Sequence, residues 1–156
     1  MRAGITAIRR RIEYEKALFI PCFLAESLVM ASFDDGIYDS LTGLLAPPYF
    51  YESSERLLSW AERSHRPVSL ISIRLPSLND DLLLKCARDL ISELRGGDLL
   101  ARMGNQIFAL LLLGDKLGAE QLIFRLKNTI KPELTYEATA IEVGEGIEAG
   151  LQRLAI

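Results

Sequence analysis

A helix is predicted near the N-terminus by apolar residues that recur on one face, with charged residues on the other faces. The apolar positions are Ile5, Ile8, Ile12 and Phe19. Residues 9–11 are three arginines, but acidic residues follow them closely, so we interpret them as a solvated face.

A strongly apolar run follows at residues 17–33, which read ALFIPCFLAESLVMASF. It is short for a membrane span, and Pro21 and Glu26 interrupt it. It also lacks the features of a secretory signal. We therefore predict a helix that is buried or faces a second subunit, with no insertion into a membrane.

The rest of the chain alternates between helical and strand patterns. After a loop at 34–48, we expect helices near 50–61, 80–94, 117–130 and 147–154, and strands near 68–75, 98–103, 106–113 and 135–143. Gly104 and Asn105 tolerate a positive φ, which favours a tight hairpin between the second and third strands. The pattern predicts an α/β sandwich, with a central mixed sheet, an internal antiparallel hairpin and flanking helices.

The composition of the chain limits the kinds of binding and catalysis that it can support. The 156 residues carry 18 basic and 21 acidic side chains, a net charge of −3, which disfavours binding to nucleic acid. One His argues against Ser-His-Asp catalysis and excludes metal sites built from several histidines. Two distant cysteines fit neither a disulfide framework nor a zinc cluster, so we predict a reducing, cytoplasmic location.

Three motifs in order resemble the GGDEF domain, the fold of bacterial diguanylate cyclases. Residues 39–44 read DSLTGL and are followed by Phe50, Arg66-Pro67 leads into the first strand, and residues 97–108 read GDLLARMGNQIF. The family's five-letter motif falls on Gly104, Asn105, Gln106, Ile107 and Phe108. The resemblance implies the cyclase-like fold over residues 39–156, with residues 1–38 as an N-terminal helical extension.

Several positions depart from the family pattern. Gln106 and Ile107 replace acidic residues of the motif, and Arg74 stands where the family has a metal-binding Asp. Residues 78–80 run directly into the next helix, where the family has a longer guanine-binding stretch, and residues 46–48 replace a polar and basic segment. Because phosphoryl transfer needs carboxylates to hold the metal, these departures predict that the domain is not an enzyme and has no metal or cofactor.

One further feature resembles the family's inhibitory site, an RxxD motif that binds cyclic di-GMP. Arg95 and Asp98 stand at the motif's spacing from the hairpin, and Arg125 falls about where the family often adds an arginine. A guanidinium can bind a guanine edge or a phosphate, and a carboxylate can accept from guanine N–H groups. The alternatives are a helix C-cap with solvated charges for residues 95–98 and an ordinary surface charge for Arg125.

The predicted function is a catalytically inactive GGDEF-like receptor or scaffold for cyclic di-GMP. The alternative is a protein-interaction module that keeps the fold but binds no nucleotide. In both cases the apolar N-terminal region is expected to form a homodimer or to bind a partner protein.

Overall fold

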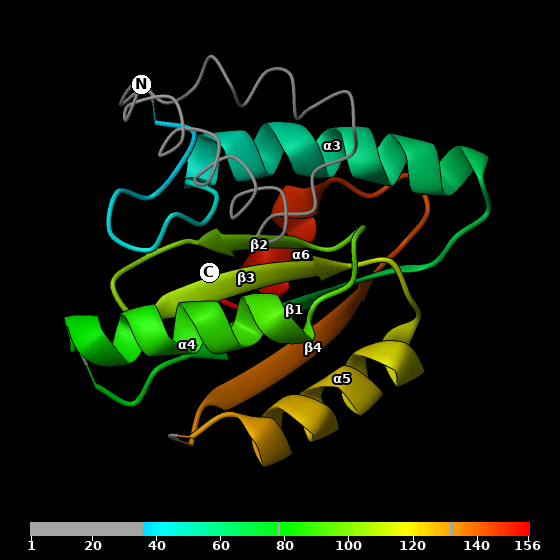
Figure 1. Ribbon diagram of the computed structural model, residues 1–156. Coiled ribbons are helices and arrows are strands. Elements are labelled where there is room, and N and C mark those ends of the chain that lie inside the picture. The colour runs from blue at the N-terminus through cyan, green and yellow to red at the C-terminus, as the bar shows by residue number, and fades with distance from the viewer. Residues whose placement is uncertain (1–35, 78, 132) are drawn as a thin grey trace, which may run out of the picture.

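The computed structural model describes residues 36–77, 79–131 and 133–156. The described chain forms α3 (Pro47–Arg63), β1 (Val68–Arg74), α4 (Asp80–Glu93), β2 (Leu99–Arg102), β3 (Ile107–Leu112), α5 (Lys116–Thr129), β4 (Thr135–Ile141) and α6 (Ile147–Arg153) (Figure 1). The predicted α/β class and the predicted order of these elements are confirmed. The predicted N-terminal helix, the apolar run 17–33 and almost all of the predicted segment 1–38 lie outside the described residues, so these remain predictions.

The four strands form one sheet in the order β2-β3-β1-β4, and every pair of neighbours is antiparallel. This corrects the expected mixed sheet. Each crossover helix joins two strands that run in the same direction, but an antiparallel strand lies between them in both cases. Among the described residues, a parallel pairing occurs only at the isolated bridge between Leu45 and Ala101.

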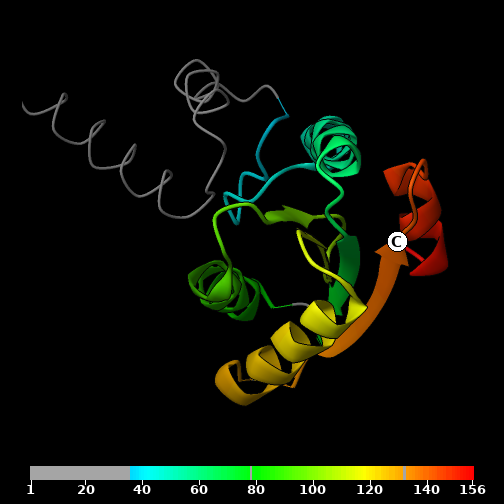
Figure 2. The same ribbon diagram turned by 90° about the vertical axis from the view of Figure 1, so that its right-hand side faces the viewer.

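Helices cover both faces of the sheet, α4 and α5 on one face and α3 and α6 on the other (Figure 2). Successive side chains of a strand point to opposite faces. In β1, Ile71 and Ile73 pack beneath α4 and α5, whereas Leu70 packs beneath α3 and α6. The central strands are thus buried on both sides, which explains the continuous apolar runs in the sequence.

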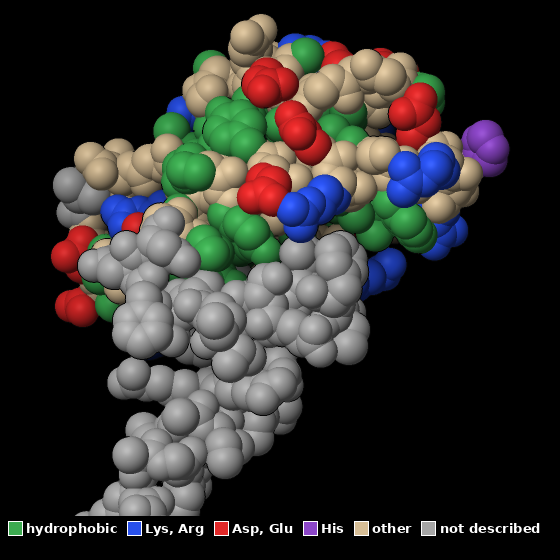
Figure 3. Space-filling model, turned by 90° about the horizontal axis from the view of Figure 1, so that it is seen from above, with side chains coloured by type: hydrophobic (Ala, Val, Ile, Leu, Met, Phe, Trp, Pro, Cys, Tyr) green, Lys and Arg blue, Asp and Glu red, His purple; other side chains and the backbone are tan. Residues whose placement is uncertain are grey.

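Local signals fix where the helices begin. The Asn79 side chain accepts a hydrogen bond from the Leu82 N–H at the start of α4, and Asp115 accepts from the Gly118 N–H at the start of α5. Helix α3 begins at Pro47, in the segment predicted as loop, because proline is well suited to the first turn of a helix. Its outer side shows hydrophobic side chains among acidic and basic ones (Figure 3).

Within the part of the chain that the structure describes, no helix is long and apolar enough to cross a membrane.

Candidate functional site

Arg95, Asp98 and Arg125 meet at one corner of the molecule, between the end of α4, the start of β2 and the middle of α5. The Asp98 carboxylate accepts the Arg95 N–H at 3.0 Å and the Leu113 N–H at 3.4 Å. Its side chain is buried, with only 6% of the residue exposed. The carboxylate therefore closes the turn 95–98 against the end of β3.

The electrostatics of Asp98 reflect this burial. Burial raises the pKa of the Asp98 carboxyl above its ordinary value of 3.8. The N–H groups of Arg95 and Leu113 and the positive charges of Arg95 and Arg125 offset only part of the rise. Both guanidinium groups are therefore close enough to act on this carboxylate, although Arg125 belongs to the later helix α5.

The two arginines differ in how many of their guanidinium N–H groups already have a partner in the chain. The Arg125 Nε forms an ion pair with the Glu93 carboxylate at 2.9 Å, and its Nη2 donates to the Glu93 carbonyl at 2.7 Å. Arg95 is exposed, and among the described residues its guanidinium has no hydrogen-bond or ion-pair partner. Within the part of the chain that the structure describes, Arg95 is thus the arginine of this corner whose guanidinium is free to bind a ligand.

Gly97 keeps the turn compact. A Cβ added at this position would lie 2.8 Å from the Leu113 Cδ1, closer than side chains normally approach. Gly97 therefore leaves room for the end of the Leu113 side chain to pack against the turn.

The hairpin motif lies at the end of the sheet remote from this corner. Gly104, Asn105 and Gln106 form the turn, Ile107 begins β3, and Phe108 is fully buried in the core. Ile107 is the register partner of Arg74.

Arg74 turns toward the chain's last residues, where it donates to the carbonyls of Leu154 at 2.8 Å and Ala155 at 3.1 Å. Magnesium, which the fold family implies, needs carboxylate or similar oxygen ligands. Arg74, Gln106 and Ile107 offer no carboxylate, so these positions do not fit the ion and no metal-dependent step follows from them. Among the described residues, no three His, Cys, Asp or Glu side chains gather at a metal-binding distance.

Two sequence motifs meet in a contact that the sequence analysis missed. The Arg102 guanidinium donates to both oxygens of Asp39, at 3.0 and 3.2 Å. Asp39 also accepts from the N–H and hydroxyl of Thr42, at 2.8 and 2.6 Å. Gly43, at φ +71°, completes this turn. The sequence could have suggested this ion pair, since Asp39 and Arg102 both belong to family motifs.

The model of the family described as "Diguanylate cyclase, GGDEF domain" matches residues 36–151. The chain belongs to the GGDEF family. No curated protein is similar enough to the chain to count as a match.

Solved structures of GGDEF proteins have the same fold. A sensory box/GGDEF family protein from Caulobacter crescentus is 20% identical, with a TM-score of 0.69 over 74% of this chain and 91% of that chain. The GGDEF domain of DgcB from Caulobacter crescentus, solved in complex with c-di-GMP, is 14% identical, with a TM-score of 0.67 over 78% and 86%. Diguanylate cyclase SiaD from Pseudomonas aeruginosa, solved with its activator SiaC, is 22% identical, with a TM-score of 0.69 over 97% and 65%.

The prediction that the domain is not an enzyme is wrong on this comparison. The matching family is that of the diguanylate cyclases, and the match runs through all the positions on which the prediction rested. Substitutions at a few ligand positions do not place a chain outside its family. The predictions for bound metal and cofactor are not tested by these comparisons.

Proposed function

We propose that this GGDEF domain binds cyclic di-GMP at the corner formed by Arg95, Asp98 and Arg125. The observation that carries the proposal is the exposed guanidinium of Arg95, which lacks a partner among the described residues, beside a turn that Asp98 holds rigid. A rigid turn that presents an exposed guanidinium suits a ligand with two phosphates and two guanine edges. Crystal structures of GGDEF domains with c-di-GMP among the structural neighbours make this ligand the natural candidate.

Each residue has a distinct role in the proposal. Arg95 donates directly to a phosphate or a guanine edge. Asp98 holds the backbone of Arg95, and its remaining lone pairs accept from guanine N–H groups where the ligand covers the turn. Arg125 contributes less, because Glu93 already occupies part of its guanidinium.

Calorimetric titration of the full chain with cyclic di-GMP tests the proposal. Arg95→Ala should weaken binding about ten- to a hundred-fold, since a hydrogen bond to a charged group is lost. Arg125→Ala should weaken it less. Arg88→Ala, an exposed arginine of α4 with no partner among the described residues, is the matched control and should bind as the wild type does.

Asp98→Ala needs a second measurement, because it leaves two N–H groups without their acceptor. We expect weaker binding together with a lower melting temperature, whereas Arg95→Ala should leave the melting temperature nearly unchanged. Wild-type protein that binds no cyclic di-GMP at high micromolar ligand contradicts the proposal. The alternative, a GGDEF-fold module that binds only proteins, would then replace it.

Two further proposals concern the location and the assembly of the protein. We propose a cytoplasmic location, supported by the free thiol of buried Cys86. We also propose that the apolar N-terminal region forms a homodimer or binds a partner protein, as its sequence favours.

A further inference from the structure

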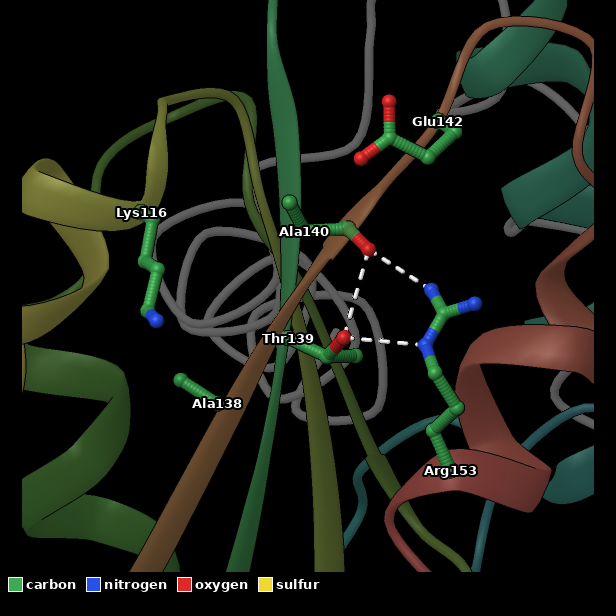
Figure 4. Close-up of a pocket in the computed structure, with 6 residues that line it drawn as sticks. All are labelled: Lys116, Ala138, Thr139, Ala140, Glu142 and Arg153. Carbon is green, nitrogen blue, oxygen red and sulfur yellow. Dashed lines mark hydrogen bonds between the residues drawn. The ribbon is translucent and has the colours of Figure 1, made fainter.

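The guanidinium of Arg153 is fully occupied by its own chain, although it lines a groove of about 360 Å³ beside β4 (Figure 4). Its Nε donates to the Thr139 hydroxyl at 3.0 Å, and its Nη2 donates to the Ala140 carbonyl at 2.7 Å. Both Nη atoms also bind the Glu145 carboxylate. All three nitrogens are engaged, so Arg153 holds the turn between β4 and α6 and leaves no nitrogen without a partner for a ligand.

The guanidinium of Arg125, at the corner described above, is only partly occupied. Its Nε pairs with the Glu93 carboxylate at 2.9 Å and its Nη2 donates to the Glu93 carbonyl at 2.7 Å, while its Nη1 has no partner among the described residues. Glu93 thus supplies both contacts, one from its side chain and one from its backbone. The carbonyl is enough to keep the guanidinium in place, whereas the carboxylate also neutralises its charge.

The carboxylate of Glu93 stands where it does not help its own helix. Glu93 is the last residue of α4, and the last turn of α4 contains no basic residue. The C-terminal end of a helix carries a partial negative charge, so an acidic side chain there is unfavourable. The free carbonyl at this end needs a donor, and Arg125 provides one. Helix stability therefore explains the backbone contact of Arg125, but it does not explain the carboxylate.

The four charged side chains of the corner cancel one another, since Arg95 and Arg125 face two carboxylates. Asp98 cannot be removed without harm, because it accepts the N–H groups of Arg95 and Leu113. The Glu93 carboxylate accepts no backbone N–H from the described chain, and its ion pair is partly exposed, so it contributes little to stability. An anionic ligand therefore meets one carboxylate that the fold does not need.

We propose that Glu93 is an autoinhibitory contact of the corner, which holds Arg125 in a neutral pair until a phosphate of cyclic di-GMP replaces the carboxylate. This inference rests on the proposed function of the corner. A phosphate that takes the place of the carboxylate binds Nε and the unoccupied Nη1, while the Glu93 carbonyl keeps Nη2. Competition between two anions for Arg125 then sets the affinity of the domain for the ligand.

Calorimetric titration of the full chain with cyclic di-GMP tests the competition. Glu93→Gln removes the charge but keeps the shape of the side chain, and it should tighten binding about three- to five-fold. Its melting temperature should stay nearly unchanged, because loss of the ion pair is offset by loss of an unfavourable charge at the end of α4. Asp81→Asn removes an equal charge from the start of α4, about 18 Å away along the helix, and should bind as the wild type does.

A double-mutant cycle shows whether Glu93 acts through Arg125. Competition predicts that Arg125→Ala weakens binding more in the Glu93→Gln background than in the wild type, because only there is the whole guanidinium available to the ligand. Simple repulsion between Glu93 and the ligand predicts an equal or smaller loss, and that result overturns the inference.

The same titrations separate this inference from the proposed function. Wild-type protein that binds no cyclic di-GMP contradicts the proposed function, and this inference falls with it. Wild-type protein that binds the ligand, together with a Glu93→Gln variant that binds it no more tightly, overturns the autoinhibitory role alone.

Discussion

At the scale of single residues, charged side chains of the family motifs hold loops together. Asp98 ties its own turn to β3, and Arg102 ties the hairpin strand β2 to the turn at Asp39. Because Asp98 stands just past the predicted end of a helix, the sequence alone predicts no large loss of stability when its side chain is truncated. Its burial and its two N–H donors contradict that expectation, because truncation leaves both donors without their acceptor.

The turn at Asp39 gives a prediction for acid stability. Burial alone raises the pKa of Asp39, but hydrogen bonds from Thr42 and Arg102, and the Arg102 charge, outweigh it and hold the pKa below its ordinary value of 3.8. The lowered pKa means that Asp39 contributes stability above about pH 4, and that this contribution is lost as the pH falls through the folded-state pKa. Asp39→Asn should cost about 1–3 kcal/mol at pH 7 and much less at pH 3.

Urea unfolding at both pH values measures this difference. Asp81→Asn is the control, since Asp81 is exposed and only contributes to the first turn of α4. An Asp39→Asn protein whose free energy of unfolding falls by the same amount at both pH values would rule out the role of the carboxylate charge.

At the scale of elements, the periodicity of the sequence was a good guide because it reports which face of a helix or strand is buried. The helix predicted near residues 80–94 is α4, and its buried residues Leu83, Cys86, Ala87 and Leu90 recur at helical spacing. Periodicity could not predict the contacts between elements that are distant in the sequence. The acceptors of Arg74 lie about 80 residues later, and the bond from Leu113 to Asp98 depends on how β2 and β3 pair. The antiparallel pairing of β1 with β4 depends likewise on the whole topology.

The docking of α6 on the sheet gives a prediction at this scale. A Cβ at Gly150 would collide with the Ile141 Cδ1 and lie 3.2 Å from the Leu70 Cδ2. The end of the Ile141 side chain must shift, so Gly150→Ala should destabilise the domain by about 1 kcal/mol, even after the helix propensity of alanine is counted. Ile141→Val removes the colliding methyl group, so the double variant should recover part of the loss in thermal unfolding. Gly104→Ala, with open space around the added methyl, should be nearly neutral.

At the scale of the whole molecule, the domain has separate surfaces for separate contacts. The corner of Arg95 lies at one end of the sheet, the hairpin turn at the other, and β4 forms one of its two edges. The predicted N-terminal association region is a further contact that lies outside the described residues. Substitutions at one surface can therefore test its contact while they leave the other surfaces unchanged.

The N-terminal region gives the prediction at this scale. If its apolar face joins two subunits, the double variant Ile8→Ser and Ile12→Ser should lower the molar mass of the full chain in light scattering. Burial of each side chain contributes about 1.5–3 kcal/mol, so the loss is large enough to dissociate a micromolar dimer. Arg10→Ala should not change the mass. An unchanged molar mass in the double variant would refute the N-terminal dimer.

The position of β1 between β3 and β4 also affects how the protein is made. Its strand partner β4 follows the other three strands of the sheet in the sequence, so one edge of the apolar strand β1 stays unpaired in a nascent chain until β4 has been synthesised. The strands β1, β2 and β3 can pair first, but the sheet is complete only when β4 joins β1. A chain released before β4 would carry an unpaired apolar strand in place of its natural edge, which makes prematurely terminated products of this domain a substrate for aggregation and for chaperones.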